Sequence, residues 1–230
     1  MKVDRLVRRS DKAPLQQQER ADQPLVIIID DDSSVREALS DLLLSAGLHA
    51  ISFASPTALT EAGDVLDRPG CIILDVRMPG TSGLDLQNRL LRDGNSKPII
   101  FLTGHGDIPM TVQAMKAGAV DFLTKPVRDQ TLIDAVIAAL ELDATRRRIT
   151  ALVSKNINCF NCLTPREREV FGRIAIGRVN KQIAFDLGIS EVTVKLHRSN
   201  VMRKMQVASI GELIRAWEVL PISLRGTASG

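Results

Sequence analysis

The stretch IIIDDDSSVR, residues 27–36, joins a strongly apolar run to three consecutive carboxylates. The apolar run begins at Leu25, and no basic side chain follows the acidic group until Arg36. Such a run, bounded by a polar cluster, predicts a buried strand over residues 25–29. Like charges at one end of a buried strand repel one another unless a positive group lies beside them. The stretch therefore predicts a site for a cation or a phosphate at the end of this strand.

Similar apolar runs return along the chain and alternate with helical patterns. Further strands are expected at 49–53, 71–74, 98–102 and 119–123, and helices at 34–46, 56–66, 83–93, 108–117 and 129–148. Alternating strands and helices predict an α/β fold, a doubly wound five-stranded parallel sheet with helices on both faces. Ligands of such sheets bind beyond the carboxyl ends of the strands.

The chain after residue 162 has a different pattern, in which every expected element is a short helix. These helices are expected at 165–176, 180–187, 191–205 and 209–217. Thr164 and Pro165 are typical of a helix start, and Asn180 and Ser190 are placed to cap the second and third helices. The stretch from residue 149 to Leu163 is expected to be irregular. We therefore predict a disordered arm (1–24), an α/β domain (25–145), a linker (146–162) and an all-α four-helix domain (163–220).

Charge differs between the two predicted domains. Residues 25–128 hold nine basic and thirteen acidic side chains, whereas residues 158–230 hold eleven and six. An acidic part followed by a basic part is typical of an input module joined to a module that binds nucleic acid. No apolar run approaches the roughly 20 residues that cross a bilayer. The N-terminal residues lack the apolar core of a signal peptide, so we expect a cytoplasmic protein without a membrane partner.

The three cysteines, Cys71, Cys159 and Cys162, do not indicate a disulfide framework, because their number is odd. Cys159 and Cys162 have a spacing found in zinc and redox sites. Structural zinc needs four ligands, and no histidine is suitably spaced nearby. A metal or redox role for this pair is therefore not favoured.

Polar residues of particular types follow the other strands of the predicted sheet. Asp75 follows the third strand, Thr103 ends the fourth, and Lys125 follows the fifth. Because the carboxyl ends of parallel strands meet at one edge, these residues are expected to lie near Asp30 and Asp31. Mg²⁺ binds a few carboxylates together with water and phosphate oxygens. An aspartate can attack phosphorus, while a hydroxyl and a lysine share the charge on the phosphoryl oxygens. The pattern predicts Mg²⁺ and, through it, a phosphoryl group.

The blocks VIIIDDD, IILDVRMPGTSG, FLTGHGD and DFLTKP resemble the receiver domain of two-component response regulators. The resemblance implies a sheet of strand order 2-1-3-4-5 and a phosphoacceptor at Asp75, with a sensor histidine kinase as the donor. It implies that Asp30, Asp31 and the backbone carbonyl of Arg77 hold Mg²⁺ beside Asp75.

The same resemblance implies three residues that respond to the phosphoryl group. Thr103 is the switch hydroxyl, Lys125 pairs with the phosphate, and Phe122 is the aromatic switch residue. The bond between Lys125 and Pro126 is expected to be cis, which costs little before proline.

Residues 180–197, NKQIAFDLGISEVTVKLH, form a helix, a tight turn at Gly188 and a second helix. This arrangement is typical of a helix-turn-helix, whose second helix enters the major groove of DNA. The helical spacing places Val194, Val201 and Met205 toward the core, and Lys195 and Ser199 on another face. Arg198, Arg203 and Lys204 are expected to add charge for the DNA backbone.

The blocks TPREREV, NKQIA, LGIS and TVKLH resemble the LuxR-type DNA-binding domain, so the whole chain is similar to the FixJ branch of response regulators. The resemblance implies a homodimer, formed on phosphorylation, that binds double-stranded DNA and regulates transcription. It places Thr193, Lys195, Leu196 and Ser199 toward bases or phosphates, and Asn180, Lys181, Ser190 and Arg203 near the backbone. Ser199 stands where some relatives carry a lysine, so their base preference does not transfer.

An enzyme of the haloacid dehalogenase type is the alternative. These Mg²⁺-dependent phosphatases also use strand-end aspartates, which would make Asp30 the nucleophile and Asp32 the general acid. Their usual acidic pair is missing after Lys125, and Asp75 would have no role. Asp32 is also placed to cap the helix at 34–46. The regulator is therefore the favoured interpretation.

Overall fold

The computed structural model of the protein describes residues 23–104 and 108–226. Most of the predicted N-terminal arm (residues 1–22) and residues 105–107 of the FLTGHGD block lie outside the described residues. The chain forms two compact units, divided between Arg146 and Arg147.

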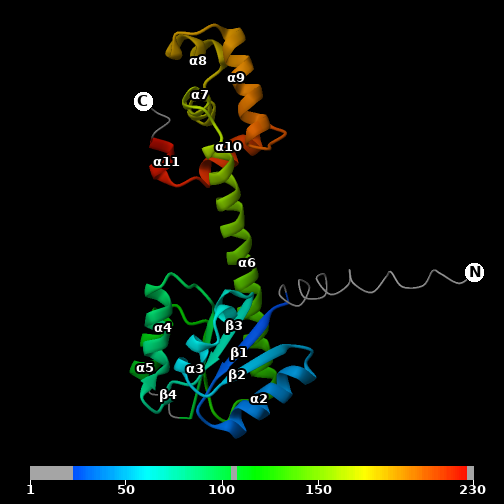
Figure 1. Ribbon diagram of the computed structural model, residues 1–230, viewed down its shortest axis with the longest axis vertical. Helices are drawn as coiled ribbons and strands as arrows, with labels where there is room; N and C mark the ends of the chain where they lie inside the picture. The colour runs from blue at the N-terminus through cyan, green and yellow to red at the C-terminus, as the bar shows by residue number, and fades with distance from the viewer. Residues whose placement is uncertain (1–22, 105–107, 227–230) are drawn as a thin grey trace, which may run out of the picture. The chain divides into compact units, whose positions relative to one another are not determined.

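Five strands form one parallel sheet in the first unit (Figure 1). They are β1 (Leu25–Ile29), β2 (His49–Phe53), β3 (Gly70–Leu74), β6 (Ile99–Thr103) and β7 (Asp121–Thr124). Their order is β2-β1-β3-β6-β7, which confirms the order implied by the resemblance. Ile29 lies opposite both Phe53 and Leu74, and Thr103 lies opposite Thr124. The residues that follow these strands therefore share one edge of the sheet.

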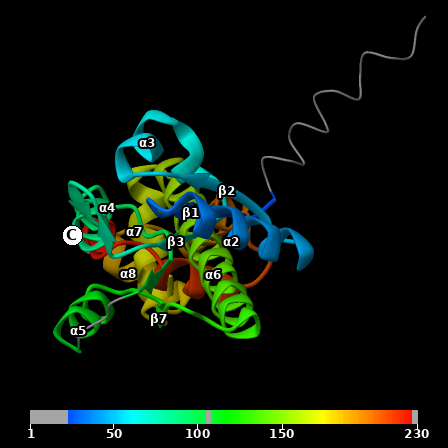
Figure 2. The ribbon, with the colours of Figure 1, turned by 90° about the horizontal axis from the view of Figure 1, so that it is seen from below.

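Helices cover both faces of the sheet, as predicted. They are α2 (Ser33–Ser45), α3 (Pro56–Glu61), α4 (Gly83–Arg92), α5 (Ile108–Lys116) and α6 (Asp129–Asn161). Ile28 packs with Leu43 of α2 and Val136 of α6, whereas Ile27 packs with residues of α3, α4 and α5, such as Leu90. Figures 1 and 2 show α2 and α6 on one side of the sheet and the other three on the opposite side. Neighbouring residues of β1 thus serve two separate cores, because strand side chains alternate in direction.

Two short features were not predicted in the first unit. The expected helix at 56–66 ends at Glu61, because Gly63 takes a positive φ of 70° and a 3-10 turn, Asp64–Asp67, follows. The strands β4 (Arg77–Met78) and β5 (Thr81–Ser82) form a small antiparallel pair beyond β3. Two-residue strands are too short to give a recognisable alternation of apolar and polar residues.

The prediction of an irregular stretch from residue 149 to Leu163 is wrong, because most of this stretch is helical. Helix α6 does not end at residue 148 but continues to Asn161. Residues 129–161 contain neither glycine nor proline, the residues that most often end a helix. Neither α6 nor any other helix within residues 23–104 and 108–226 is long and apolar enough to span a bilayer.

The second unit is entirely helical in its described residues. It comprises the end of α6 and the helices α7 (Pro165–Ala175), α8 (Asn180–Leu187), α9 (Glu191–Lys204), α10 (Ile210–Glu218) and α11 (Ile222–Gly226). Its core includes Phe160 and Phe171, which pack with Trp217. The ring centroids of Phe171 and Trp217 are 4.9 Å apart in an edge-to-face arrangement. The four predicted helices are present, and the short helix α11 was not expected.

Candidate functional site

The aspartates that follow β1 have different roles. Asp30 is buried, and its backbone N–H donates to Phe53 at 3.2 Å. Its Oδ1 accepts from the backbone N–H of Asp32 at 3.0 Å. The Asp32 carboxylate instead caps α2 by accepting from the N–H of Ser34 at 2.8 Å. Asp32 is therefore a capping residue, as the sequence indicated, while Asp30 faces the edge of the sheet.

Asp75 is held at the end of β3 by backbone contacts. Its N–H donates to Ile29 at 2.8 Å, and its Oδ1 accepts from the N–H of Arg77 at 3.1 Å. Gly83 packs against its peptide so closely that an added Cβ would lie 2.3 Å from the Asp75 backbone oxygen. The side chain of Ser82 donates to Val76 at 3.3 Å and closes the same loop. Gly83 therefore has a steric role beside Asp75 that sequence reasoning had not identified.

Lys125 joins two of the carboxylates. Its Nζ lies 2.5 Å from Oδ2 of Asp30 and 3.0 Å from Oδ2 of Asp75. Asp30, Asp31 and Asp75 each offer a carboxylate oxygen within 4.8 Å of the others. The Lys125–Pro126 peptide is cis, as expected. The structure thus brings together the four charged residues that the strand-end argument placed at one edge.

The electrostatics of this acidic cluster favour an additional cation. Burial raises the pKa of the Asp30 carboxyl above its usual range, although the hydrogen bond from Lys125 opposes the shift. Burial alone would lower the pKa of Lys125, but its hydrogen bonds to Asp30 and Asp75 outweigh that effect and raise it. Lys125 therefore remains charged at neutral pH. One ammonium group lies beside a cluster of three carboxyl groups, and carboxylate oxygens are the ligands that Mg²⁺ prefers.

Thr103 and Phe122 lie on the neighbouring strands β6 and β7. Thr103 is buried, and its backbone oxygen accepts from the N–H of Lys125 at 2.8 Å. Phe122 is half-buried, and its ring lies 5.9 Å from that of Phe101, measured between centroids. Thr103 therefore ends its strand directly beside the lysine.

Arg36 is a supporting residue that sequence reasoning did not identify. Its Nη1 donates to the backbone oxygens of Asp30 and Asp31, at 2.7 and 3.0 Å. It thereby fixes the backbone of the loop that carries two of the acidic side chains. The available signal was its position one turn into α2, where a long side chain can reach back to the preceding loop.

In the second unit, residues at the helix ends define the two helices of the helix-turn-helix. Gly188 takes φ 64° and ψ 35° and ends α8, a left-handed conformation that glycine adopts readily. Ser190 caps α9 by accepting from the N–H of Thr193 at 3.1 Å, as predicted. Asn180 does not cap α8, because the helix begins with it and the capping position belongs to Val179. The side chain of Gln182 accepts from the N–H of Val179 at 3.0 Å instead.

Helix α9 presents one face to the core and another to solvent. Val194, Val201 and Met205 are buried, as their spacing predicted. Most of the residues that are expected to face DNA are exposed. The exposed ones are Lys181, Ser190, Lys195, Leu196, Ser199 and Arg203, whereas Thr193 and Asn180 are half-buried. Lys204, also expected to add charge for the DNA backbone, has its Nζ paired with Glu167 at 2.7 Å. Its charge is therefore partly balanced within the domain, and its contact with DNA stays a prediction.

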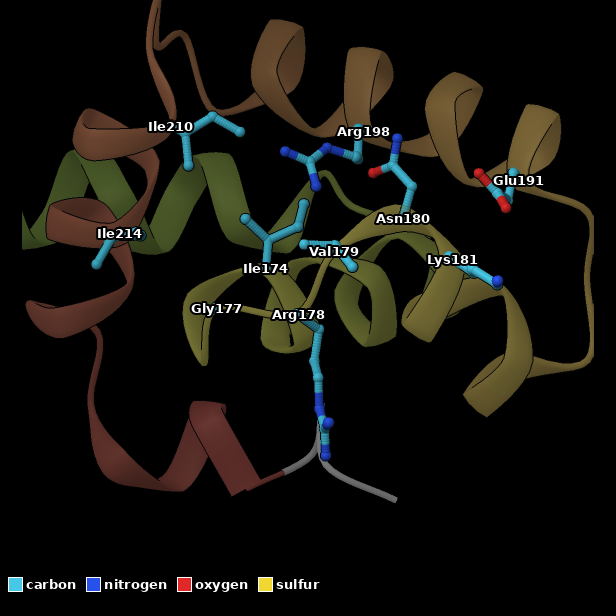
Figure 3. A pocket seen from close by; sticks show the side chains of 10 residues that line it. All are labelled: Ile174, Gly177, Arg178, Val179, Asn180, Lys181, Glu191, Arg198, Ile210 and Ile214. Carbon is cyan, nitrogen blue, oxygen red and sulfur yellow. The ribbon is translucent and has the colours of Figure 1, made fainter.

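A hollow of about 580 Å³ lies on the flank of α9 (Figure 3). Asn180 and Lys181 from the start of α8 and Arg198 from α9 line it, together with Arg178 and several isoleucines. Lys195 lies one turn before Arg198 on α9, so the hollow adjoins the exposed face of that helix. Three cationic side chains and the carboxylate of Glu191 therefore line a hollow beside the helix that is expected to read DNA.

Sequence comparison assigns both parts of the chain to known families. Residues 26–137 match the family described as Response regulator receiver domain, and residues 161–217 match that described as Bacterial regulatory proteins, luxR family. The chain belongs to the two-component response regulators that join a receiver domain to a LuxR-type DNA-binding domain. Such proteins regulate transcription and are not classical enzymes, and they act with a histidine kinase and with DNA. This finding supports the regulator over the phosphatase alternative.

Relatives are similar along most of the chain. Nodulation protein W of Bradyrhizobium diazoefficiens is 47% identical over 209 residues, which cover 91% of this chain and 92% of the relative. Transcriptional regulatory protein FixJ of Azorhizobium caulinodans is 48% identical over 190 residues, covering 83% and 90%. The solved structure of the response regulator StyR has a TM-score of 0.77 at 46% identity, covering 85% of this chain and 98% of that one.

Proposed function

We propose that Asp75 accepts a phosphoryl group from a sensor histidine kinase, and that the phosphorylated protein dimerises and binds operator DNA in the cytoplasm. The observation that carries this proposal is the position of the Asp75 carboxylate. It lies beside the Lys125 ammonium and within a cluster that includes the Asp30 and Asp31 carboxylates. In this proposal the receiver domain spans residues 25–145 and the DNA-binding domain residues 163–220.

Asp30, Asp31 and Asp75, with the backbone carbonyl of Arg77, would hold Mg²⁺. The three carboxylate oxygens lie close enough to share one ion, and their charge exceeds what Lys125 can balance. Bound Mg²⁺ would neutralise this charge and bind an oxygen of the incoming phosphoryl group.

The transfer is a displacement at phosphorus. A carboxylate oxygen of Asp75 attacks the phosphorus of phosphohistidine, and a new O–P bond forms as the P–N bond breaks. The electron pair of the broken bond remains on the imidazole nitrogen of the kinase. Lys125, already 3.0 Å from the Asp75 carboxylate, pairs with the phosphoryl oxygens, and the Thr103 hydroxyl donates to them. Phe122 turns inward behind Thr103 and alters the surface of β7.

The altered surface then favours dimerisation. Helix α5 exposes Ile108, Val112 and Met115, whose relative exposures are 82%, 44% and 43%. Neighbouring apolar side chains of this kind are suited to burial against a second copy. A dimer places two α9 helices on successive half-sites of DNA. In the complex Thr193, Lys195, Leu196 and Ser199 face bases or phosphates, and Asn180, Lys181, Ser190 and Arg203 lie near the backbone.

Incubation with acetyl phosphate and Mg²⁺ tests the proposal. The wild-type protein is expected to gain one phosphoryl group on Asp75, to sediment as a dimer and to bind DNA more tightly. Asp75→Asn is expected to keep the fold, as judged by circular dichroism, and to lose all three responses. A response to the phosphodonor in Asp75→Asn that equals the wild-type response would contradict the mechanism.

A further inference from the structure

Asp31 belongs to the acidic cluster, but its carboxylate is restrained by fewer contacts than the other two. Lys125 pairs with Asp30 at 2.5 Å and with Asp75 at 3.0 Å. Asp31 is exposed, and in the described part of the chain its carboxylate has neither a hydrogen bond nor an ion pair. The direction of this side chain is therefore set by the backbone on either side of its Cα atom.

Arg36 holds both peptide groups that flank the Cα atom of Asp31. Its Nη1 donates to the backbone oxygen of Asp30, on one side, at 2.7 Å and to that of Asp31, on the other, at 3.0 Å. The backbone N–H of Arg36 also donates to the backbone oxygen of Asp32 at 3.1 Å. One residue thus binds three consecutive carbonyl groups of the acidic loop. Because hydrogen bonds from a charged donor are stronger than neutral ones, they restrain the rotation of both peptides.

We propose that Arg36 is a positioning residue of the Mg²⁺ site and that it acts through Asp31. By fixing the peptides on both sides of Asp31, it keeps a carboxylate oxygen of that residue within 4.8 Å of those of Asp30 and Asp75. Groups that orient metal ligands without touching the metal typically contribute about 10–100-fold to metal affinity. The inference rests on the proposed function, because it concerns the ion that assists phosphorylation of Asp75.

The charge of Arg36 has the opposite effect to this positioning. A guanidinium group beside the site repels a divalent cation, so removal of the charge alone would tighten Mg²⁺ binding. Loss of the hydrogen bonds to the two backbone oxygens would instead free the Asp31 side chain and weaken Mg²⁺ binding. The sign of the change in Mg²⁺ affinity therefore distinguishes a positioning residue from a simple charge.

Isothermal titration calorimetry of the full-length protein with MgCl₂ measures that sign. Arg36→Met removes the donors but keeps a long unbranched side chain, and is expected to weaken Mg²⁺ binding about tenfold. Arg36→Lys keeps a charged donor on a shorter side chain, and its affinity is expected to lie between those of wild type and Arg36→Met. In Asp31→Asn protein, Arg36→Met is expected to weaken binding further by at most about twofold, because residues that act through one contact have non-additive effects.

A matched control and a second measurement complete the experiment. Arg92 is an exposed arginine on α4, and Arg92→Met is expected to leave the Mg²⁺ affinity unchanged. Phosphorylation by acetyl phosphate is then followed at increasing Mg²⁺ concentrations. Arg36→Met is expected to need about ten times more Mg²⁺ for its half-maximal rate. At saturating Mg²⁺ it should reach the wild-type rate, because Asp75 and Lys125 are unchanged.

The inference is overturned if Arg36→Met binds Mg²⁺ as tightly as wild type or more tightly. It is also overturned if the effect of Arg36→Met adds in full to that of Asp31→Asn, or if the rate at saturating Mg²⁺ falls as well. If circular dichroism shows that Arg36→Met does not fold, Arg36→Lys takes its place, and an affinity equal to or above that of wild type overturns the inference.

Failure of the proposed function has a different signature. A wild-type protein that binds Mg²⁺ but gains no phosphoryl group contradicts the proposed function alone, and the Mg²⁺ affinities still decide the role of Arg36. A wild-type protein that binds no Mg²⁺ overturns both.

Discussion

Lys125 and Asp75 follow different strands and are 50 positions apart in the sequence, yet Nζ of one lies 3.0 Å from Oδ2 of the other. The same Nζ is 2.5 Å from Oδ2 of Asp30. Lys125 is therefore the positive group that allows two buried carboxylates to lie at one sheet edge. Its removal leaves those carboxylates facing each other without a counter-charge.

Lys125→Gln is expected to lower the free energy of unfolding of the first unit in metal-free buffer. The loss should be roughly 1.5–3 kcal/mol, the usual contribution of hydrogen bonds to charged groups. Added Mg²⁺ should restore part of it, because a ligand that binds only the folded state stabilises that state. Urea unfolding followed by circular dichroism measures both effects. Lys116→Gln, an exposed change on α5, is the control, and equal stabilities of Lys125→Gln and wild type would contradict the assigned role.

Two adjacent aspartates should separate metal binding from helix capping. Asp31→Asn is expected to weaken Mg²⁺ binding at least tenfold, because it removes one of the three clustered carboxylates. Asp32→Asn should leave Mg²⁺ affinity almost unchanged, because the Asp32 carboxylate caps α2 and an asparagine also caps well. Isothermal titration calorimetry of both variants measures the affinities. A larger loss of Mg²⁺ affinity in Asp32→Asn than in Asp31→Asn would show that Asp31 has been wrongly assigned as a metal ligand.

The second unit should lose stability in acid through Glu167. Burial opposes ionisation of this carboxyl, but hydrogen bonds from Lys204 and from Thr164 outweigh burial and hold its pKa below the usual range. A lowered folded pKa gives stability that is present above the unfolded pKa and is lost as the pH falls through the folded pKa. Glu167→Gln should therefore be less stable than wild type by about 1–3 kcal/mol at pH 7, with a smaller difference in acid.

The fluorescence of Trp217, the one tryptophan, reports unfolding of this unit selectively. Urea titrations at several pH values then measure the difference between wild type and Glu167→Gln. Glu218→Gln is the control, because that side chain is exposed at the end of α10. A difference that stays constant from pH 7 down to pH 3 would show that ionisation of Glu167 does not stabilise the domain.

Neighbouring cations at the end of α9 should affect DNA binding differently. Arg203 is exposed and is proposed to contact the DNA backbone, whereas Lys204 is paired with Glu167. Arg203→Gln should weaken binding to all sequences alike and reduce the slope of log K against log salt by about 0.9. Lys204→Gln should change that slope much less and should instead lower stability. Fluorescence anisotropy over a range of KCl concentrations measures the slopes, and equal changes in both variants would contradict this assignment.

The sequence was sufficient to predict the sheet and the convergence of the strand-end residues. The apolar runs define each strand, and the common edge of a parallel sheet brings Asp30, Asp75 and Lys125 together without further information. Contacts made by long side chains could not be predicted in the same way. Arg36 reaches back to the acidic loop, and Lys204 pairs with a residue 37 positions earlier. Neither partner is specified by periodicity, because a flexible side chain can take many directions from one backbone position.

The length of α6 was missed for a different reason. The helix was expected to end at residue 148, after three arginines, but basic residues stabilise a helix terminus without ending the helix. Glycine and proline, which do interrupt helices, are absent from residue 129 until Pro165, and α6 accordingly continues to Asn161. The cap of α8 was misplaced by one residue, from Val179 to Asn180, because asparagine is a frequent capping residue.

Gly83 links the packing of the receiver to the chemistry at Asp75. An added Cβ would lie 2.3 Å from the Asp75 backbone oxygen, so Gly83→Ala must displace that peptide or α4. Because small displacements of a reacting group cost large factors in rate, phosphorylation by acetyl phosphate should slow at least tenfold. Gly80→Ala is the matched control, since Gly80 has a positive φ of 82° but no atom within 4 Å of the added Cβ. It introduces backbone strain in the same loop without touching Asp75. Rates that are equal in the two variants, each first shown to be folded by circular dichroism, would mean that Gly83 does not position Asp75.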